Sequence, residues 1–398
     1  MPKIASSRTT SSCIVSGNED LMINILSRLT VKVLSTFKCV SKQWNMLISD
    51  PYFVSSHQAR ATQDPNVLKV LWVDYRDGSI GVCSIREKEE RIVTVDLTWP
   101  NYPDSFLRQD FIIMEGRPCN GLICLLAGGY EGDTLVCNPA TGNTMEIQRG
   151  NKRKHTYVQG LGYCSSRNEF KVVRLCERSK LDKSIPENNH WYGCELFTVG
   201  QRGALGTNLP QHSRSWRYVG DLPFEIENPI CRAMCYVNGS AHWMIGYGNS
   251  SSSEFILSLD LELEEFKVIA RPVDWAEDEN FDYMMPIAMH LMELEGKLCV
   301  ADNVFSREVL EIWVLKDYNK SIWSKEYEID LETIDLKHSL RYFPIVGLWR
   351  GQLLLEGKCN RMLCYDQKTN SYEEVVQLEP FHNYGGSATF VENLITPF

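Results

Sequence analysis

The stretch Asn-Gly-Leu-Ile-Cys-Leu at residues 120–125 joins a turn dipeptide to four apolar residues. An Asn-Gly pair beside an apolar run is a strong short-range signal for a tight turn that leads into a β-strand. The same order returns at residues 238–243, 295–300 and 350–355. Gly121 and the glycines of these three copies are 118, 57 and 55 residues apart, so the first interval has room for two units. Residues 160–175 fill that interval as a variant copy.

A second pattern follows these turns: an apolar strand, a polar turn and an aromatic-led strand. It occurs at 257–268, 312–323 and 362–372, with earlier copies at 134–143 and 194–216. Four strands in a unit of 40 to 60 residues are typical of a β-propeller blade. We count five units from residue 111 onward, a sixth over 67–97 and a closing strand at 388–394. The predicted fold is mainly β, a propeller of about six blades; the alternative, two β-sandwiches, would not repeat this order.

Residues 18–50 follow a helical period instead. Leu21, Ile25 and Leu29 recur every four residues, the spacing of an amphipathic helix. Asn18 is expected to cap this helix, because its side chain can accept a hydrogen bond from a backbone N–H of the first turn.

Two further short helices are expected, at 31–40 and around 44–48, and Pro51 is expected to stop the last one. Three helices in so short a segment bury little apolar surface on their own, so this unit should rest on a partner or on the following domain. The predicted organisation is a disordered tail over 1–16, a helical module over 17–60 and a β domain over 66–398.

Composition narrows the class of protein. Of the 398 residues, 43% are hydrophobic and 23% charged, and the net charge is −10. A general nucleic-acid binder needs a basic face, so no nucleic-acid partner is expected. No run of 18 apolar residues and no secretory signal are found, so no membrane span is expected either. The 14 cysteines are scattered through apolar runs, which favours reduced, buried thiols in the cytoplasm or nucleus.

Residues 19–53 resemble an F-box. The β domain resembles the F-box-associated domain of plant proteins, and the S-locus F-box proteins share this layout. The resemblance rests on four runs in the β domain: 119–122, 138–141, 160–163 and 170–173.

The resemblance implies that the helices bind a Skp-type adaptor and, through it, a cullin scaffold. The β domain would hold a target protein for ubiquitin transfer by a separate enzyme, so the chain itself is expected to have no catalytic residue, cofactor or metal. The expected adaptor-binding residues are Asn18, Glu19, Leu21, Ile25, Leu26, Leu29, Val31, Leu34, Phe37, Val40 and Trp44. Aromatic residues in an acidic loop, Trp275, Phe281 and Tyr283, are expected to contact the target.

The sequence departs from the F-box pattern in two places. Gly17 and Asn18 stand where the family has Leu-Pro, and Thr30 stands where it has Pro. One lost apolar contact would cost roughly 1.5–3 kcal/mol. A propeller interaction module that no longer joins a ligase is therefore the alternative function.

The sequence contains no clear motif for a metal site, a catalytic residue or a nucleotide-binding loop. Cys231 and Cys235 are four residues apart and Cys359 and Cys364 are five apart, but the eight histidines are dispersed and form no ligand pair, so buried thiols on strands are expected. His242 is expected to be a packed core histidine rather than a base. No nucleophile elbow or dinucleotide loop is present. A propeller hydrolase, such as a glycosidase, stays a third alternative without a recognisable carboxylate pair.

Overall fold

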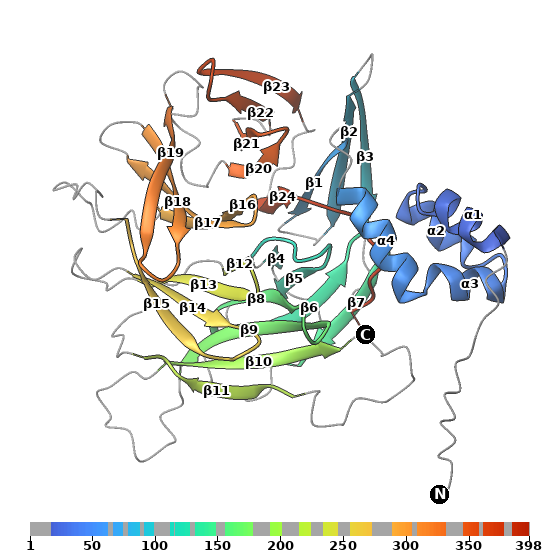
Figure 1. Ribbon diagram of the computed structural model, residues 1–398, viewed down its shortest axis with the longest axis horizontal. Helices are drawn as coiled ribbons and strands as arrows, with labels where there is room; N and C mark the ends of the chain where they lie inside the picture. The colour runs from blue at the N-terminus through green and yellow to red at the C-terminus, as the bar shows by residue number, and fades with distance from the viewer. Residues whose placement is uncertain are drawn as a thin grey trace, which may run out of the picture.

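The computed structural model describes residues 17–62, 67–74, 79–87, 91–98, 112–114, 116–127, 132–148, 156–177, 192–200, 215–223, 234–245, 255–272, 289–304, 309–331, 345–357, 361–377 and 384–397. Two parts form it: an N-terminal group of short helices and a ring of four-stranded sheets (Figure 1). The predicted tail over 1–16 lies outside the described residues.

The helical unit, residues 17–62, contains four helices where the sequence predicted three. They are α1 (Gly17–Leu26), α2 (Val31–Phe37), α3 (Lys42–Ile48) and α4 (Pro51–Thr62). Pro51 does not merely stop α3, because it is the first residue of α4, a position where proline loses no helical hydrogen bond. The Asp50 carboxylate accepts from the backbone N–H of Tyr52 at 2.8 Å and so completes the start of α4. Asn18 lies inside α1 rather than ahead of it, so its predicted capping role is wrong.

Side-chain caps explain where the middle helices begin. Thr30 precedes α2, and its hydroxyl accepts from the backbone N–H of Val33 at 3.5 Å. Ser41 does the same for α3 by accepting from the N–H of Trp44 at 3.1 Å. Threonine and serine are favoured at this position because they satisfy an otherwise unpaired backbone donor. Thr30 therefore starts α2 with a side-chain cap at the position where the F-box pattern has proline.

Six four-stranded antiparallel sheets confirm the predicted six-bladed propeller. Blade 1 contains β24 (Tyr384–Thr389), β1 (Val67–Asp74), β2 (Ile80–Glu87) and β3 (Arg91–Thr98). Blade 2 contains β4 (Ile112–Met114), β5 (Ile123–Ala127), β6 (Asp133–Asn138) and β7 (Asn143–Ile147). Blade 3 contains β8 (Thr156–Cys164), β9 (Glu169–Glu177), β10 (Tyr192–Gly200) and β11 (Arg217–Asp221).

The last three blades follow the same order along the chain. Blade 4 contains β12 (Cys235–Val237), β13 (Ser240–Ile245), β14 (Phe255–Asp260) and β15 (Phe266–Ala270). Blade 5 contains β16 (Met289–Leu294), β17 (Lys297–Val304), β18 (Val309–Asp317) and β19 (Ile322–Asp330). Blade 6 contains β20 (Ile345–Trp349), β21 (Gln352–Glu356), β22 (Arg361–Asp366) and β23 (Ser371–Gln377).

The ring closes through β24, which comes last in the chain but pairs with β1, with Leu71 opposite Ala388. Closure joins the two ends of the domain and removes a free sheet edge. The sequence predicted the closing strand at 388–394, whereas the strand ends at Thr389. The chain beyond it, residues 390–397, leaves the sheet and turns toward the helices.

The repeated Gly turns connect the first two strands of four blades. Gly121 and the residue before it both have positive φ, as do the matching pairs at 238–239, 295–296 and 350–351. Positive φ at both central residues is the geometry of the type I′ hairpin turn, which tolerates Asn and Gly best. We call the side of the ring that carries these turns the turn face. Blade 3 differs, because its corresponding turn spans residues 165–168 without glycine.

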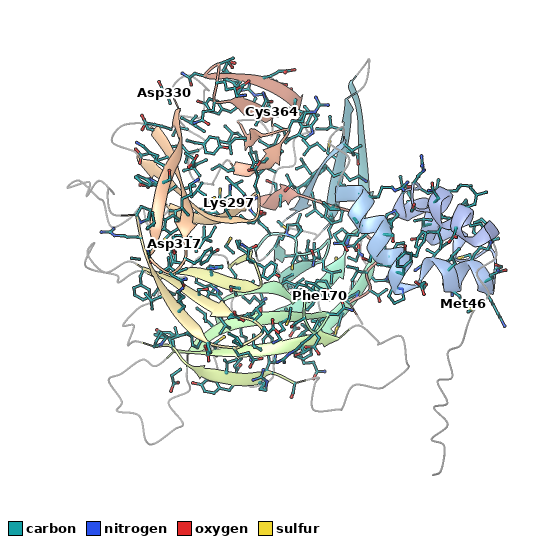
Figure 2. All side chains as sticks on the ribbon, in the orientation of Figure 1. Met46, Phe170, Lys297, Asp317, Asp330 and Cys364 are labelled. Atoms are coloured by element: carbon teal, nitrogen blue, oxygen red, sulfur yellow. The ribbon has the colours of Figure 1, made fainter. Side chains whose placement is uncertain are left out.

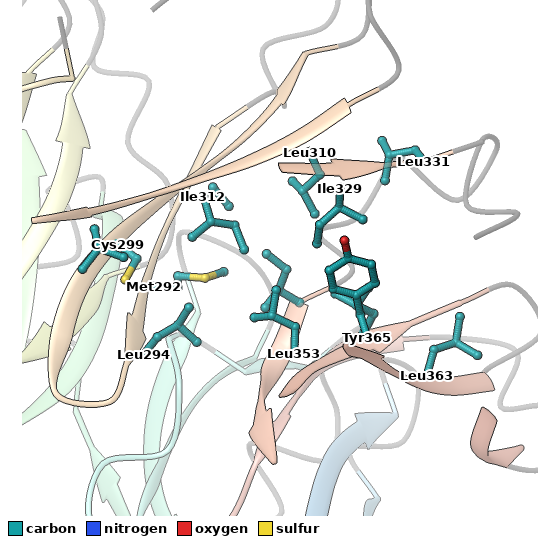
Figure 3. Packing of buried hydrophobic residues seen from close by; sticks show 14 residues of the cluster. Met292, Leu294, Cys299, Leu310, Ile312, Ile329, Leu331, Leu353, Leu363 and Tyr365 are labelled. Carbon is teal, nitrogen blue, oxygen red and sulfur yellow. The ribbon is translucent and has the colours of Figure 1, made fainter. Parts of the chain in front are cut away.

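Apolar side chains between neighbouring blades form the core. Between blades 5 and 6, Met292, Ile312, Leu353 and Tyr365 belong to one buried cluster (Figure 3). Similar clusters occupy the other contacts, so every blade is buried on both faces. Buried strand faces explain why the sequence shows runs of apolar residues here instead of strict alternation.

Candidate interaction surface

The helical unit has a small core of its own. Leu26, Val31, Leu34, Ile48 and Phe53 are buried together, and Leu394 from the far end of the chain completes the cluster. His57 of α4 lies 2.9 Å through Nε2 from the Leu29 carbonyl oxygen, which ties α4 to the first two helices. In Figure 1, α4 lies between the propeller and the other three helices.

Several large apolar side chains of the helical unit are not covered. The exposed fraction of Leu21 is 60%, that of Ile25 is 52% and that of Val40 is 64%. Met46 is 74% exposed and lies on the side of the unit away from the propeller (Figure 2). Leu21 and Ile25 are one helical turn apart and therefore share a face of α1. A concentration of uncovered apolar side chains on so small a unit is typical of an interaction site.

The predicted adaptor-binding residues divide into four groups. Leu21, Ile25 and Val40 are exposed, as a contact surface requires. The half-buried residues Leu29, Phe37 and Trp44 pack on the helical core, and the rings of the last two meet edge to face at 5.0 Å. Asn18 and Glu19 lie in the first turn of α1. The fully buried residues are Leu26, Val31 and Leu34.

Burial changes the role of that last group. A side chain inside the helical core holds the unit together and offers no surface to a partner. Met46 and Tyr52 take their place as exposed residues that the sequence analysis missed. Pro51 in the sequence indicates a helix end and gives no sign that Tyr52 belongs to a further helix, and Met46 lies outside the apolar repeat of its helix. The apolar side chains that are more than half exposed are called the exposed set: Leu21, Ile25, Val40, Met46 and Tyr52.

The predicted target-contacting residues Trp275, Phe281 and Tyr283 lie outside the described residues. Their position in the chain is after β15 and before β16. β15 ends at Ala270, which pairs with Phe255 at the start of β14. This end of the strand is opposite the turn face, so the chain leaves blade 4 on the other side of the ring.

His242 lies in the core of blade 4, as the sequence predicted. The residue is buried, and its Nδ1 lies 3.2 Å from the Cys235 carbonyl oxygen. Burial lowers the pKa of His242 to about 4, because the charged imidazolium is poorly solvated there. No described acidic or nucleophilic side chain hydrogen-bonds to it. The buried ring therefore has a packing role.

The cysteines in the described part are mostly core residues. Ten of the eleven are buried and only Cys39 is exposed. Burial raises the pKa of the Cys83 thiol to about 11 and that of Cys299 to about 12. Such thiols are poor nucleophiles and poor metal ligands at neutral pH. Among the described residues, no group of three His, Cys, Asp or Glu side chains is placed to hold a metal ion.

Charged residues in blade 3 form buried pairs. Arg174 donates to a Glu195 carboxylate oxygen through Nη2 at 2.6 Å, and the Trp216 ring covers its guanidinium at 3.7 Å. Lys171 lies 3.0 Å from Glu264 of blade 4. Each charge is paired, which is the condition for burying it. These pairs join neighbouring strands and blades.

None of the helices within the described ranges has the length and apolar character needed to cross a bilayer.

Comparison with known proteins agrees with this arrangement. A family profile described as F-box associated beta propeller domain matches residues 74–383, and the F-box domain profile matches residues 18–56. The F-box protein At3g07870 of Arabidopsis thaliana is 26% identical, over 90% of this chain and 87% of its own length. The F-box protein At5g10340 of the same plant is 27% identical, over 88% of this chain and 78% of its own length.

Proposed function

Because this chain belongs to the F-box proteins that carry an F-box-associated β-propeller domain, we propose that it is the target-recruiting subunit of a cullin-based ubiquitin ligase. The helical unit binds a Skp-type adaptor, and the propeller binds a protein target in the cytoplasm or nucleus. The chain supplies no catalytic group. It raises the effective concentration of target lysines near a ubiquitin-charged enzyme.

The uncovered apolar surface of the helices carries this proposal. Leu21, Ile25, Val40, Met46 and Tyr52 are all more than half exposed, although the unit spans only residues 17–62. Burying such side chains against a partner is the main source of affinity in protein interfaces. The propeller offers a closed, rigid ring whose outgoing loops can be changed without loss of the core.

A second function is favoured by one observation. Gly17 and Asn18 replace the Leu-Pro of the F-box pattern, which removes an apolar side chain at the start of α1. If the exposed set does not compensate, the chain is a propeller interaction module outside any ligase. Both functions predict a folded propeller, so only adaptor binding separates them.

The deciding experiment measures binding of the full chain to a purified Skp-type adaptor by calorimetry. We expect a dissociation constant below about 10 μM, and a change of both Leu21 and Ile25 to Asp should weaken it about 10- to 100-fold. The matched control is Leu263→Asp, because Leu263 is 67% exposed but lies on blade 4, and its change should leave binding unaltered. Absence of binding by the unchanged chain would leave the second function.

A further inference from the structure

The segment 390–397 joins two parts of the molecule that are far apart in the sequence. It follows the closing strand β24 and passes between α4 and blade 2 (Figure 1). The backbone N–H of Phe390 donates to the Lys69 carbonyl at 2.9 Å, and the Glu392 carboxylate pairs with the Lys69 ammonium at 2.5 Å. The segment therefore begins firmly attached to blade 1.

Two neighbouring residues of the segment belong to different cores. Leu394 is buried in the core of the helical unit together with Leu34 and Phe53. Ile395, the next residue, is buried in the cluster between blades 2 and 3. Val54 of α4 packs against both clusters. Leu394 thus packs against the helices, and the next residue, Ile395, packs against the propeller.

Asn393 fixes the backbone between these cores. Its side-chain oxygen accepts from Asn138 Nδ2 at 2.9 Å and from the Ile395 N–H at 3.0 Å, and its amide nitrogen donates to the Asn120 carbonyl. Asn138 Nδ2 also donates to the carbonyls of Asn393 and Ile395, at 3.1 and 2.7 Å. Both asparagines are completely buried. A buried network in which the polar groups are paired specifies one arrangement and resists alternatives.

Gly121 leaves the space that Asn393 occupies. A Cβ at Gly121 would lie 2.1 Å from Asn393 Nδ2 and 2.7 Å from the Val391 carbonyl oxygen. Gly351 is the equivalent residue in the turn of blade 6; it has the same φ of +74°, but a Cβ there would meet no atom within 4 Å. Both glycines have the positive φ that the turn requires, but only Gly121 also leaves space for residues 390–397.

We propose that residues 390–397 form a strap that fixes the orientation of the helical unit on the propeller. The strap turns two folded parts into one rigid body, which sets the direction in which a target on the propeller faces the adaptor. The second statement rests on the function proposed above. The first depends only on the contacts of Asn393, Leu394 and Ile395.

The test compares Gly121→Ala with Gly351→Ala in the full chain. Both variants carry the same backbone strain, and only Gly121→Ala pushes the strap out of place. Hydrogen exchange of α4 should rise about 10-fold or more in Gly121→Ala and stay unchanged in Gly351→Ala. Small-angle X-ray scattering should show a larger radius of gyration for Gly121→Ala alone. Protection of β13 and β17 reports in both cases that the propeller is folded.

A second pair of variants approaches the strap from the helical side. Leu394→Asp places a charge against the helical core and should raise the hydrogen exchange of α4 in the same way. Ring closure should be unaffected, because β24 ends at Thr389, before the substituted residue. Val33→Asp adds the same charge at an exposed position of α2 and is the control. Equal α4 exchange and equal scattering in Gly121→Ala and Gly351→Ala, with Leu394→Asp also like the unchanged chain, would overturn the strap.

Adaptor binding separates this inference from the proposed function. We expect Gly121→Ala to bind the adaptor as tightly as the unchanged chain, because the exposed set is untouched. If the unchanged chain does not bind the adaptor, the proposed function fails, while exchange and scattering still decide whether the strap exists.

Discussion

The helical unit and the propeller treat their apolar residues differently. Over residues 17–62 the helices expose six large apolar side chains, whereas the described parts of the six blades expose five. The propeller closes through β24, so each blade is covered by two neighbours. The helices have no such closure, and their core needs Leu394 from the other end of the chain. The propeller can therefore fold as a self-sufficient body, while the helical unit depends on it and on a partner.

Leu34→Asp is expected to have the largest effect and tests whether the helical unit can unfold while the propeller stays folded. Leu34 is completely buried in the helical core, so an unpaired charge there should unfold the unit and leave the blades intact. We expect unprotected exchange across 17–62, unchanged exchange in β13 and β17, and adaptor affinity reduced more than about 100-fold. Val33→Asp changes the preceding, exposed residue and should keep the helices folded. Loss of protection in the blades as well would show that the two parts fold as one.

Arg174→Met tests the propeller in the same way. The change removes the Arg174 guanidinium from the buried Glu195 carboxylate, and breaking a buried pair costs about 3–5 kcal/mol. Thermal unfolding followed by tryptophan fluorescence should show a lower midpoint temperature for the variant. Lys316→Met removes an ion pair with Glu326 that is substantially exposed, and it should cost no more than about 1 kcal/mol. A similar cost for the two changes would contradict the structural role of the buried pair.

Acid should weaken the propeller through His242. The folded pKa of about 4 lies below the usual value near 6.5, so the unfolded chain binds more protons between these limits. Stability is therefore complete above about pH 6.5 and falls as the pH drops toward 4, by about 2 kcal/mol at pH 5 for this one group. Urea unfolding at pH 7.5 and pH 5 measures the change. In the His242→Gln variant, the free energy of unfolding should fall less between pH 7.5 and pH 5. An equal fall in the variant and the unchanged chain would show that His242 is not the cause.

The smallest effect is expected at a helix start. Ser41→Ala removes the hydroxyl that accepts from the Trp44 N–H and should cost about 1 kcal/mol. Peptide-level hydrogen exchange should detect the change in α3 and not in the blades. Lys42→Ala, one residue later and exposed, keeps the cap and serves as the control. An effect of Lys42→Ala as large as that of Ser41→Ala would exclude capping as the cause.

Local rules account for most of the architecture that the sequence predicted. The Gly turns require positive φ, and Gly121, Gly239, Gly296 and Gly351 all have it. Because the repeat of turn and aromatic strand is a local pattern, it predicted six blades before any contact was known. Two predictions at the element boundaries were wrong, one for a local reason and one for a tertiary reason. Pro51 begins α4 instead of only ending α3, and β24 ends at Thr389 because the chain then has α4 to contact.

The candidate surface was only partly predictable. An apolar repeat at helical spacing identifies residues that need cover, and it does not say whether another helix or a partner provides the cover. Leu26 and Leu34 are as apolar as Leu21, yet the first two are buried and the last is exposed. The direction of each side chain depends on how four helices cross, which single-helix periodicity does not contain.

The sequence by itself determined the class of fold, the repeat and the family, because each follows from residue types at short spacing. The tertiary structure alone decided which apolar residues are free, and that residues 390–397 return to the start of the chain. Asn138 and Asn393 are 255 positions apart and hydrogen-bond directly. No local pattern links them, since their contact exists only after six blades have closed into a ring and brought the last segment beside the first helices.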